Sequence, residues 1–378
     1  MTSKSLFFKV QKEDLRGKAP LLFITFICMF LALPIFLAME MQKYQQWLQN
    51  DPMSYTKKFL SQELAVYLGA ENTIILMIVL GLASIFAFCQ FEYLYHREKV
   101  DFYHSIPVKR GILFWTRYLN GVVTFLIPYV ICVLLGLAVL AAGGFSSMMV
   151  VKTALLGCIV HTIGYLLCYS LTILAICLTG NLFTGVLGTL TLQGYGIVLF
   201  LLVQELASDY FMTYMQEYGT MDQIFKYTSP LYLYADLSES FYIANTMPQS
   251  KCIGMLFIAL VYGIVLSFVA FYTYLKRTSE SAGKAIAFKK LKPILKVFII
   301  ALAACVGSLL FKTLVYDTVE LWQIVGFIFT LLLGHVLLQV IFEQDVKAVR
   351  KGIPSTIVAA GAGSTLFAGF SLGSGAYD

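Results

Sequence analysis

Few residues of this 378-residue chain have types and spacings suited to chemistry. His96 and His104 stand eight positions apart with no third ligand near them, which indicates a metal site only weakly. Two Gly-Lys pairs, at 17–18 and 283–284, are each followed by alanine and lack the earlier glycine of a phosphate-binding loop. The HExxH, GxSxG and GxGxxG patterns do not occur. We therefore expect no catalytic residue, metal or cofactor on this chain, and no enzyme activity of its own.

Polar side chains inside the long apolar runs form the second group of candidates. Aspartate and glutamate are missing from the apolar cores, whereas ion-driven carriers usually place acids there, so we expect the energy source to lie elsewhere. The polar residues that remain include His161, Gln193, Lys296, His335 and Gln339. Each could line a pathway or hydrogen-bond a neighbouring helix, and for any one alone we favour the structural role. His161 and Gln193 are the candidates for a transport pathway or gate.

The elements that must position these residues follow from composition. Apolar residues make up 59% of the chain and charged residues 13%, against about 25% charge in a soluble domain. This balance excludes an ordinary globular enzyme, a disordered chain and a nucleic-acid binder, and it indicates a polytopic membrane protein. The apolar runs are continuous rather than alternating, so we expect an all-α protein and no barrel.

Nine apolar runs are long enough to cross a bilayer as helices. They are Pro20–Met39, Thr73–Tyr93, Tyr118–Ala142, Ala154–Leu178, Leu182–Val203, Cys252–Leu275, Pro293–Phe311, Leu321–Phe342 and Pro354–Leu372. Lysine and arginine are distributed unevenly around them, with nineteen on the side of the N-terminus and seven on the other. Positive charge favours the cytoplasmic side, so we expect a multi-pass plasma-membrane protein with a cytoplasmic N-terminus.

The loop between the second and third spans carries a short amphipathic pattern. Val100, Tyr103 and Ile106 recur at helical spacing, and Pro107 predicts a bend directly after them. Such a helix on the membrane surface suits contact with a cytoplasmic partner, but it could equally anchor in lipid headgroups. The N-terminal segment 1–19 has a similar pattern and predicts a second interfacial helix.

This loop reads Asp101-Phe-Tyr-His-Ser-Ile-Pro-Val-Lys-Arg110, then Leu113-Phe114 and Arg117-Tyr-Leu-Asn-Gly121. The run resembles the D-x-x-x-S-[LI]-P-V-x-R…L-F…R-Y-L-x-G pattern of bacterial ABC exporter permeases of the type-2 class. With the N-terminal helix, six spans and an outer loop that contains Ser229-Pro230, the resemblance covers roughly residues 1–277. It implies an interfacial helix at 1–19 and a six-span permease core at 20–277. Residues 278–378 would then be three additional spans. Larger Gram-positive members carry extra spans and an extracytoplasmic domain, so we expect that the chain could be truncated before one.

The resemblance also implies partners and roles. The N-terminal helix and the loop helix would contact a separate ATPase subunit that binds ATP and magnesium, and a second permease protomer would complete the transporter. The coupling positions would be Arg97, Asp101, His104, Ser105, Pro107, Lys109 and Arg110. Ser229 and Pro230 would belong to an outer gate, and the exported substrate would be an amphipathic peptide or lipid-like molecule. The alternative is an integral membrane binding or sensor protein without an ATPase.

Overall fold

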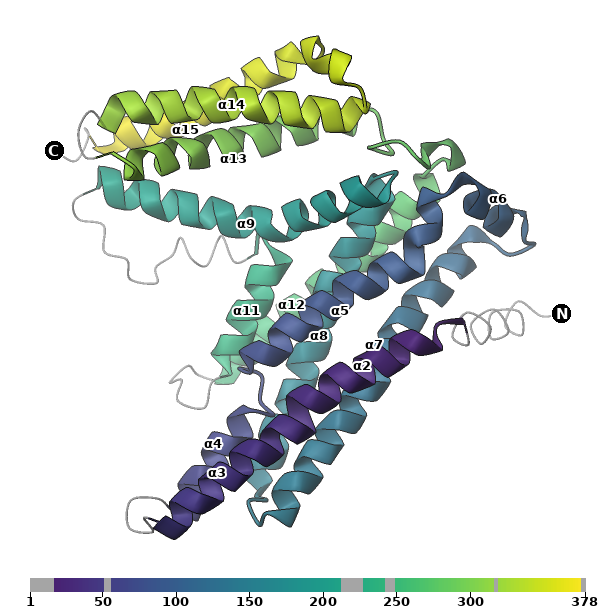
Figure 1. The fold of residues 1–378 in the computed structure, drawn as a ribbon, viewed down its shortest axis with the longest axis vertical. Helices are drawn as coiled ribbons and strands as arrows, with labels where there is room; N and C mark the ends of the chain where they lie inside the picture. Colours follow the sequence, from purple (N-terminus) through teal and green to yellow (C-terminus); the bar gives the residue numbers. More distant parts are fainter. Residues whose placement is uncertain (1–16, 51–55, 212–226, 242–248, 316–318, 375–378) are drawn as a thin grey trace. The chain divides into compact units, whose positions relative to one another are not determined.

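The computed structural model describes residues 17–50, 56–211, 227–241, 249–315 and 319–374, and helices joined by short loops make up this part of the chain (Figure 1). Nine helices in this part of the chain are long and apolar enough to cross a membrane. Within it there is no sheet, and one isolated β-bridge joins Thr179 to Ile286. The prediction of an all-α polytopic membrane protein with nine spans is confirmed. The N-terminal interfacial helix lies almost wholly outside the described residues.

The spanning helices are mostly longer than the apolar runs that predict them, because helix continues into polar flanks that a hydropathy count excludes. The third span, for example, begins at Arg110 rather than at Tyr118. The helices after the first span are α5 (Thr73–Phe91), α7 (Arg110–Ala142), α8 (Met148–Leu178), α9 (Leu182–Tyr210), α12 (Gln249–Lys276), α13 (Leu291–Thr313), α14 (Val319–Glu343) and α15 (Ile353–Ser374). Shorter helices are α4 (Lys57–Val66), α6 (Arg97–Ser105) and α11 (Pro230–Ser240).

The first span is a continuous helix with a widened turn in its middle. It consists of α2 (Ala19–Phe30), a π-helical turn at Leu31–Ile35 and α3 (Phe36–Asn50). Pro34 lies inside that turn. Its ring has no N–H and crowds the carbonyl one turn earlier, so a wider turn relieves the clash without ending the helix.

The chain divides into two compact units. The first takes Met1–Tyr93, Asp101–Leu174 and Pro230–Lys276, and the second takes Leu94–Val100, Ala175–Ser229 and Arg277–Asp378. The chain changes units at residue 277, where the resemblance places the end of the permease core, but α9 groups with α13, α14 and α15 rather than with the other spans of that core. The domain assignment from the sequence therefore stays a prediction.

In the first unit, α7 is the central helix and packs against α2, α3, α5 and α12. Its contact with α8 is built from stacked rings, of which Phe125 and Tyr165 lie 4.1 Å apart at their centroids and nearly parallel. The Tyr165 hydroxyl donates to the Gly121 carbonyl at 2.9 Å. A Cβ atom at Gly121 would lie 2.1 Å from the Tyr169 hydroxyl, so only glycine permits this approach of the two helices.

In the second unit, α13 packs against α14 and α15, and α9 adds its C-terminal half to the same core. Leu202 and Leu206 of α9 are buried together with Cys305 and Leu309 of α13. An ion pair between Asp209 and Lys312 joins the same two helices.

The segment that follows α12 is also part of the second unit. Its Ala287 N–H donates to the Leu178 carbonyl at 2.8 Å, beside the bridge between Thr179 and Ile286. Arg277 is 5% exposed and donates to the carbonyls of Ile176 and Leu94 at 2.6 and 2.8 Å. The Arg277 guanidinium therefore connects the C-terminal end of α8 to the residues that follow α5.

Candidate functional site: helix α6 and the Arg117 junction

Helix α6 is the amphipathic helix that the sequence predicts after the second span. Val100 is 2% exposed, whereas Phe102 on the other side of the helix is 64% exposed. The helix ends at Ser105, whose hydroxyl donates to the Phe102 carbonyl at 2.7 Å. The predicted bend before Pro107 is present, because α7 begins only at Arg110.

The turn from α6 into α7 brings six of the seven predicted coupling positions together. They are Asp101, His104, Ser105, Pro107, Lys109 and Arg110, and all of these except His104 are exposed. The Arg110 guanidinium lies 3.3 Å from Nδ1 of His104, which must accept because the guanidinium can only donate. Burial and the charge of Arg110 lower the pKa of His104, so the ring is neutral near pH 7. The coupling role of these residues stays a prediction.

Arg97, the seventh position, points to a different segment. Its Nε donates to the Ala282 carbonyl at 3.2 Å, in the loop that precedes α13. The start of α6 is therefore tied to that loop, within the second compact unit.

Beneath α6 lies a group of residues that we name the Arg117 junction: Gln90, Tyr93, Tyr103, Arg117 and Tyr274. Arg117 of α7 is 5% exposed and donates to the Gln90 carbonyl of α5 at 2.7 Å. Its guanidinium carbon lies 4.1 Å from the ring centroid of Tyr93 and 4.2 Å from that of Tyr103. A guanidinium over the faces of two aromatic rings is stabilised by the negative potential of those faces.

The junction connects α6 to three spanning helices. Tyr103 is the contribution of α6, and its ring meets the Tyr93 ring edge to face at 5.0 Å. The Tyr93 and Tyr274 hydroxyls are 2.8 Å apart, which brings in α12. The Gln90 side chain also accepts from Lys18, next to the start of α2. Helix α6 therefore contacts α7 directly at Arg117 and is linked through Arg117 to α5 and through Tyr93 to α12.

This junction is not predicted from the sequence. From the sequence, Arg117 is a basic residue before the third span and part of the family pattern, Tyr103 is an apolar position of the amphipathic helix, and Tyr93 has no assigned role. The available signal was the position of Arg117, because a residue four positions after Leu113 and three after Phe114 lies on the same face of a helix as these apolar residues. Nothing in the sequence indicates which two aromatic rings enclose it.

The predicted pathway residues fall into two places. His161 of α8 is fully buried; its Nε2 donates to the Gly69 carbonyl at 3.2 Å, and its Nδ1 accepts from the Tyr234 hydroxyl of α11 at 2.6 Å. Ser229 is also buried, and its hydroxyl donates to the Gln193 carbonyl at 2.7 Å. Pro230 is the first residue of α11. The structure thus pairs Gln193 with Ser229 and attaches His161 to α11, while their role in a pathway stays a prediction.

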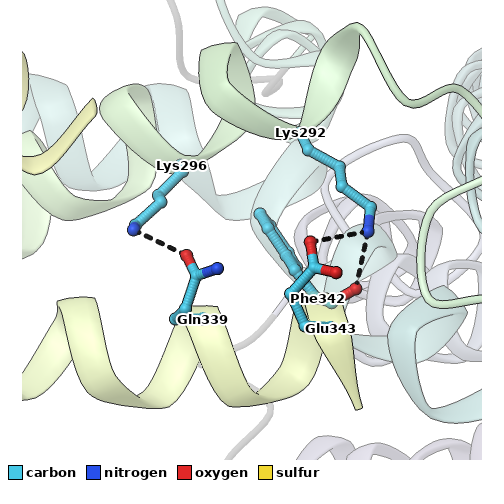
Figure 2. A network of polar contacts seen from close by, with 5 residues as sticks. All are labelled: Lys292, Lys296, Gln339, Phe342 and Glu343. Atoms are coloured by element: carbon cyan, nitrogen blue, oxygen red, sulfur yellow. Dashed lines mark hydrogen bonds and ion pairs between the residues drawn. The ribbon is translucent and has the colours of Figure 1, made fainter. Parts of the chain in front are cut away.

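Three polar residues that the sequence analysis considered one by one meet in the second unit. Lys296 of α13 is 2% exposed and donates to Gln339 of α14 at 2.8 Å, to the Gly352 carbonyl at 3.0 Å and to Nδ1 of His335 at 3.0 Å. Nε2 of His335 donates to the Val349 carbonyl at 2.9 Å, so Nδ1 is the accepting nitrogen. Figure 2 shows Lys296 reaching across to Gln339. All three residues have hydrogen-bond partners, as the structural role favoured from the sequence requires.

The described part of the chain holds no group of three or more histidine, cysteine or acidic residues that could bind a metal. Fold and site together define a polytopic helical membrane protein with a surface helix docked on its spans. Comparison with protein-family models, curated proteins and solved structures finds no match to this chain.

We expect the Arg117→Lys substitution to lower the free energy of unfolding by about 1–2 kcal/mol, because lysine keeps the charge but loses the planar stacking on two rings. Arg110→Lys is the matched control, since Arg110 is exposed and its replacement should cost no more than about 0.5 kcal/mol. Thermal unfolding of both variants in detergent measures the difference. Equal stability of the two variants would contradict the role assigned to Arg117.

We expect Gly352→Ala to lower the free energy of unfolding by about 2 kcal/mol. Gly352 has a φ of +74°, and a Cβ atom there would lie 2.6 Å from Oε1 of Gln339 and 2.9 Å from Nζ of Lys296. Relief of that contact separates two atoms that are hydrogen-bonded to each other. In the control Gly361→Ala, the added methyl meets nothing within 4 Å, so stability should stay the same or rise by up to about 1 kcal/mol. Thermal unfolding in detergent measures the change in stability of both variants, and a loss of stability in Gly361→Ala equal to that in Gly352→Ala would contradict the prediction.

Proposed function

We propose that this chain is the membrane-embedded permease subunit of an ABC exporter, energised by a separate ATPase subunit that binds ATP and magnesium. A second permease protomer, identical or homologous, completes the transporter in the plasma membrane. The N-terminus is cytoplasmic, which places α6 on the side where ATP is available. The chain itself performs no covalent chemistry.

The observation that carries the proposal is the two-sided contact of α6. Its inner side is fixed to the spans through the contact of Tyr103 with Arg117 of α7, while Asp101 and Phe102 remain exposed on the outer side, and Arg110 is exposed where α7 begins. A helix built to transmit force needs one rigid attachment and one surface for a partner. An exposed aromatic ring beside charges of both signs suits a protein partner better than an anionic membrane surface, which would repel Asp101.

In this mechanism, ATP-driven closure of two ATPase subunits displaces α6 in each protomer. The Arg117 junction passes that displacement to α5, α7 and α12, whose reorientation exposes the substrate site alternately to the two sides. Binding energy between the subunits and the nucleotide thus drives transport without an ion gradient, in agreement with spans that carry no acidic residue in their apolar cores.

The substrate is an amphipathic peptide or lipid-like molecule, and the gate is at α11. Leu233, Tyr234 and Leu237 of this helix are fully buried, and Tyr234 holds His161 of α8. Gly164 of α8 permits the contact, because a Cβ atom there would lie 2.2 Å from the Tyr234 ring. A helix seated this closely on α8 would move when α8 moves, which is what an outer gate requires.

Affinity purification from native membranes tests the proposal. We expect the eluate to hydrolyse ATP and to contain a second polypeptide with a GxxxxGK[ST] loop. The double charge reversal Lys109→Glu/Arg110→Glu should reduce the co-purified ATPase activity at least about tenfold, because two exposed cations of the α6–α7 turn would then repel an acidic partner surface.

Lys347→Glu/Arg350→Glu is the matched control, since it reverses two exposed charges on a different loop with the same predicted sidedness. This variant should retain the ATPase activity. If the wild-type eluate contains no ATPase, or if both double variants retain it equally, the exporter proposal is wrong and the rival, a binding or sensor protein with lipid-anchored loops, is favoured.

A further inference from the structure

An apolar cleft of about 330 Å³ lies within the second unit, between α9 on one side and α13 and α14 on the other. Its volume is at the lower end of the range for small-molecule sites. Gly188 of α9 and Gly334 of α14 both line it, so the absence of two side chains helps to create the space. The remaining lining is aliphatic apart from Phe342 and three threonines, Thr179, Thr184 and Thr191.

The threonine hydroxyls do not make the cleft polar, because each already donates to a backbone carbonyl. Thr179 donates to Ala175 at 2.8 Å, Thr191 to Leu187 at 2.8 Å and Thr184 to Ala285 at 2.7 Å. The walls therefore present hydrocarbon, and a polar solute would lose its hydration there without compensation. A saturated or monounsaturated hydrocarbon chain has no such hydration to lose.

One end of the cleft is strongly basic. Ile286 and Leu295 line the cleft, and the segment 276–292 has six basic residues and one acidic residue. Lys284, Lys289 and Lys290 of this segment are exposed, and Lys290 directly precedes the first residue of α13. A helix N-terminus adds favourable potential for a phosphate.

Lys292 differs from these lysines. Its Nζ lies 3.0 Å from Glu343 and 2.9 Å from the Phe342 carbonyl, which fixes the last turn of α14 at the same end of the cleft (Figure 2). Because Glu343 pairs with Lys292, it does not neutralise the neighbouring exposed lysines.

We propose that this cleft binds an anionic membrane phospholipid, with one acyl chain between α9, α13 and α14 and the phosphate against Lys289 and Lys290. Basic pockets between spanning helices bind anionic headgroups in this way. The site joins α9 to α13 and α14 with lipid, and it does not depend on the proposed transport function.

Cleft-filling variants provide the test. In Gly188→Leu, the new Cβ would lie 3.4 Å from Cγ2 of Thr179, an ordinary contact, and the side chain would enter the cleft. Gly334→Leu does the same from α14, with its Cβ 3.6 Å from Ile300. The matched control is Gly194→Leu, on α9 but outside the cleft lining, where a Cβ meets nothing within 4 Å. Thermal unfolding confirms that each variant is folded.

Native mass spectrometry of the delipidated protein, titrated with dioleoyl phosphatidylglycerol or dioleoyl phosphatidylcholine, reads out binding. We expect the protein to bind phosphatidylglycerol more tightly than phosphatidylcholine. The affinity for phosphatidylglycerol should fall about tenfold in either cleft-filling variant and stay unchanged in Gly194→Leu. The double variant Lys289→Gln/Lys290→Gln should weaken the binding of phosphatidylglycerol about tenfold and leave the binding of phosphatidylcholine unchanged.

Three results would overturn the proposal. One is equal affinity for the two lipids. Another is unchanged phosphatidylglycerol binding in both cleft-filling variants, which would place the lipid on the basic surface alone. The last is a cleft-filling variant that changes the oligomeric state without changing lipid binding, which would make a second copy of the chain the occupant.

Discussion

The structure depends on one constraint: a basic side chain that is buried in the protein must find its hydrogen-bond acceptors there, because burial removes it from water. Three cations meet this constraint in a similar way. Arg117 donates to the carbonyl of Gln90, and Arg277 donates to the carbonyls of Ile176 and Leu94. Lys296 donates to the Gly352 carbonyl. Gln90 and Ile176 lie in the last turns of α5 and α8, where helices leave carbonyl oxygens without intrahelical partners.

This arrangement makes the ends of the helices the places where they are joined. Arg117 fixes the end of α5 to α7 and, through Tyr103, to the surface helix α6. Arg277 fixes the end of α8 to the residues after α5, and Lys296 fixes α13 to α14 and to the turn before α15. Between these ends the contacts include stacked aromatic rings and hydrogen bonds such as that of Tyr165 to the Gly121 carbonyl, and close approach depends on glycines such as Gly121. A protein joined in this way can transmit movement along its helices as rigid bodies.

Much of the fold could be predicted from the sequence, and the site only in part. All nine spans, the α6 helix and the bend at Pro107 follow from local signals: apolar length, helical spacing and proline. The Arg117 junction does not, because Tyr93 and Tyr103 are brought to Arg117 by tertiary packing that no local pattern encodes. The same holds for Lys296, whose partners Gln339 and Gly352 are over forty residues away. The grouping of α9 with α13 and α15 could not be predicted from the sequence either, because an apolar helix face that packs against another helix has the same composition as one that faces lipid.

The use of main-chain carbonyls as acceptors for Arg277 has an evolutionary consequence. Every residue type supplies the same carbonyl oxygen, so a substitution at position 176 or 94 does not by itself remove the hydrogen bond, and of the three residues only the arginine is required for it. Such a contact leaves no trace of paired substitutions among relatives. Methods that infer contacts from correlated sequence change would therefore overlook the bonds that hold these helix ends together, and would detect at most a solitary invariant cation.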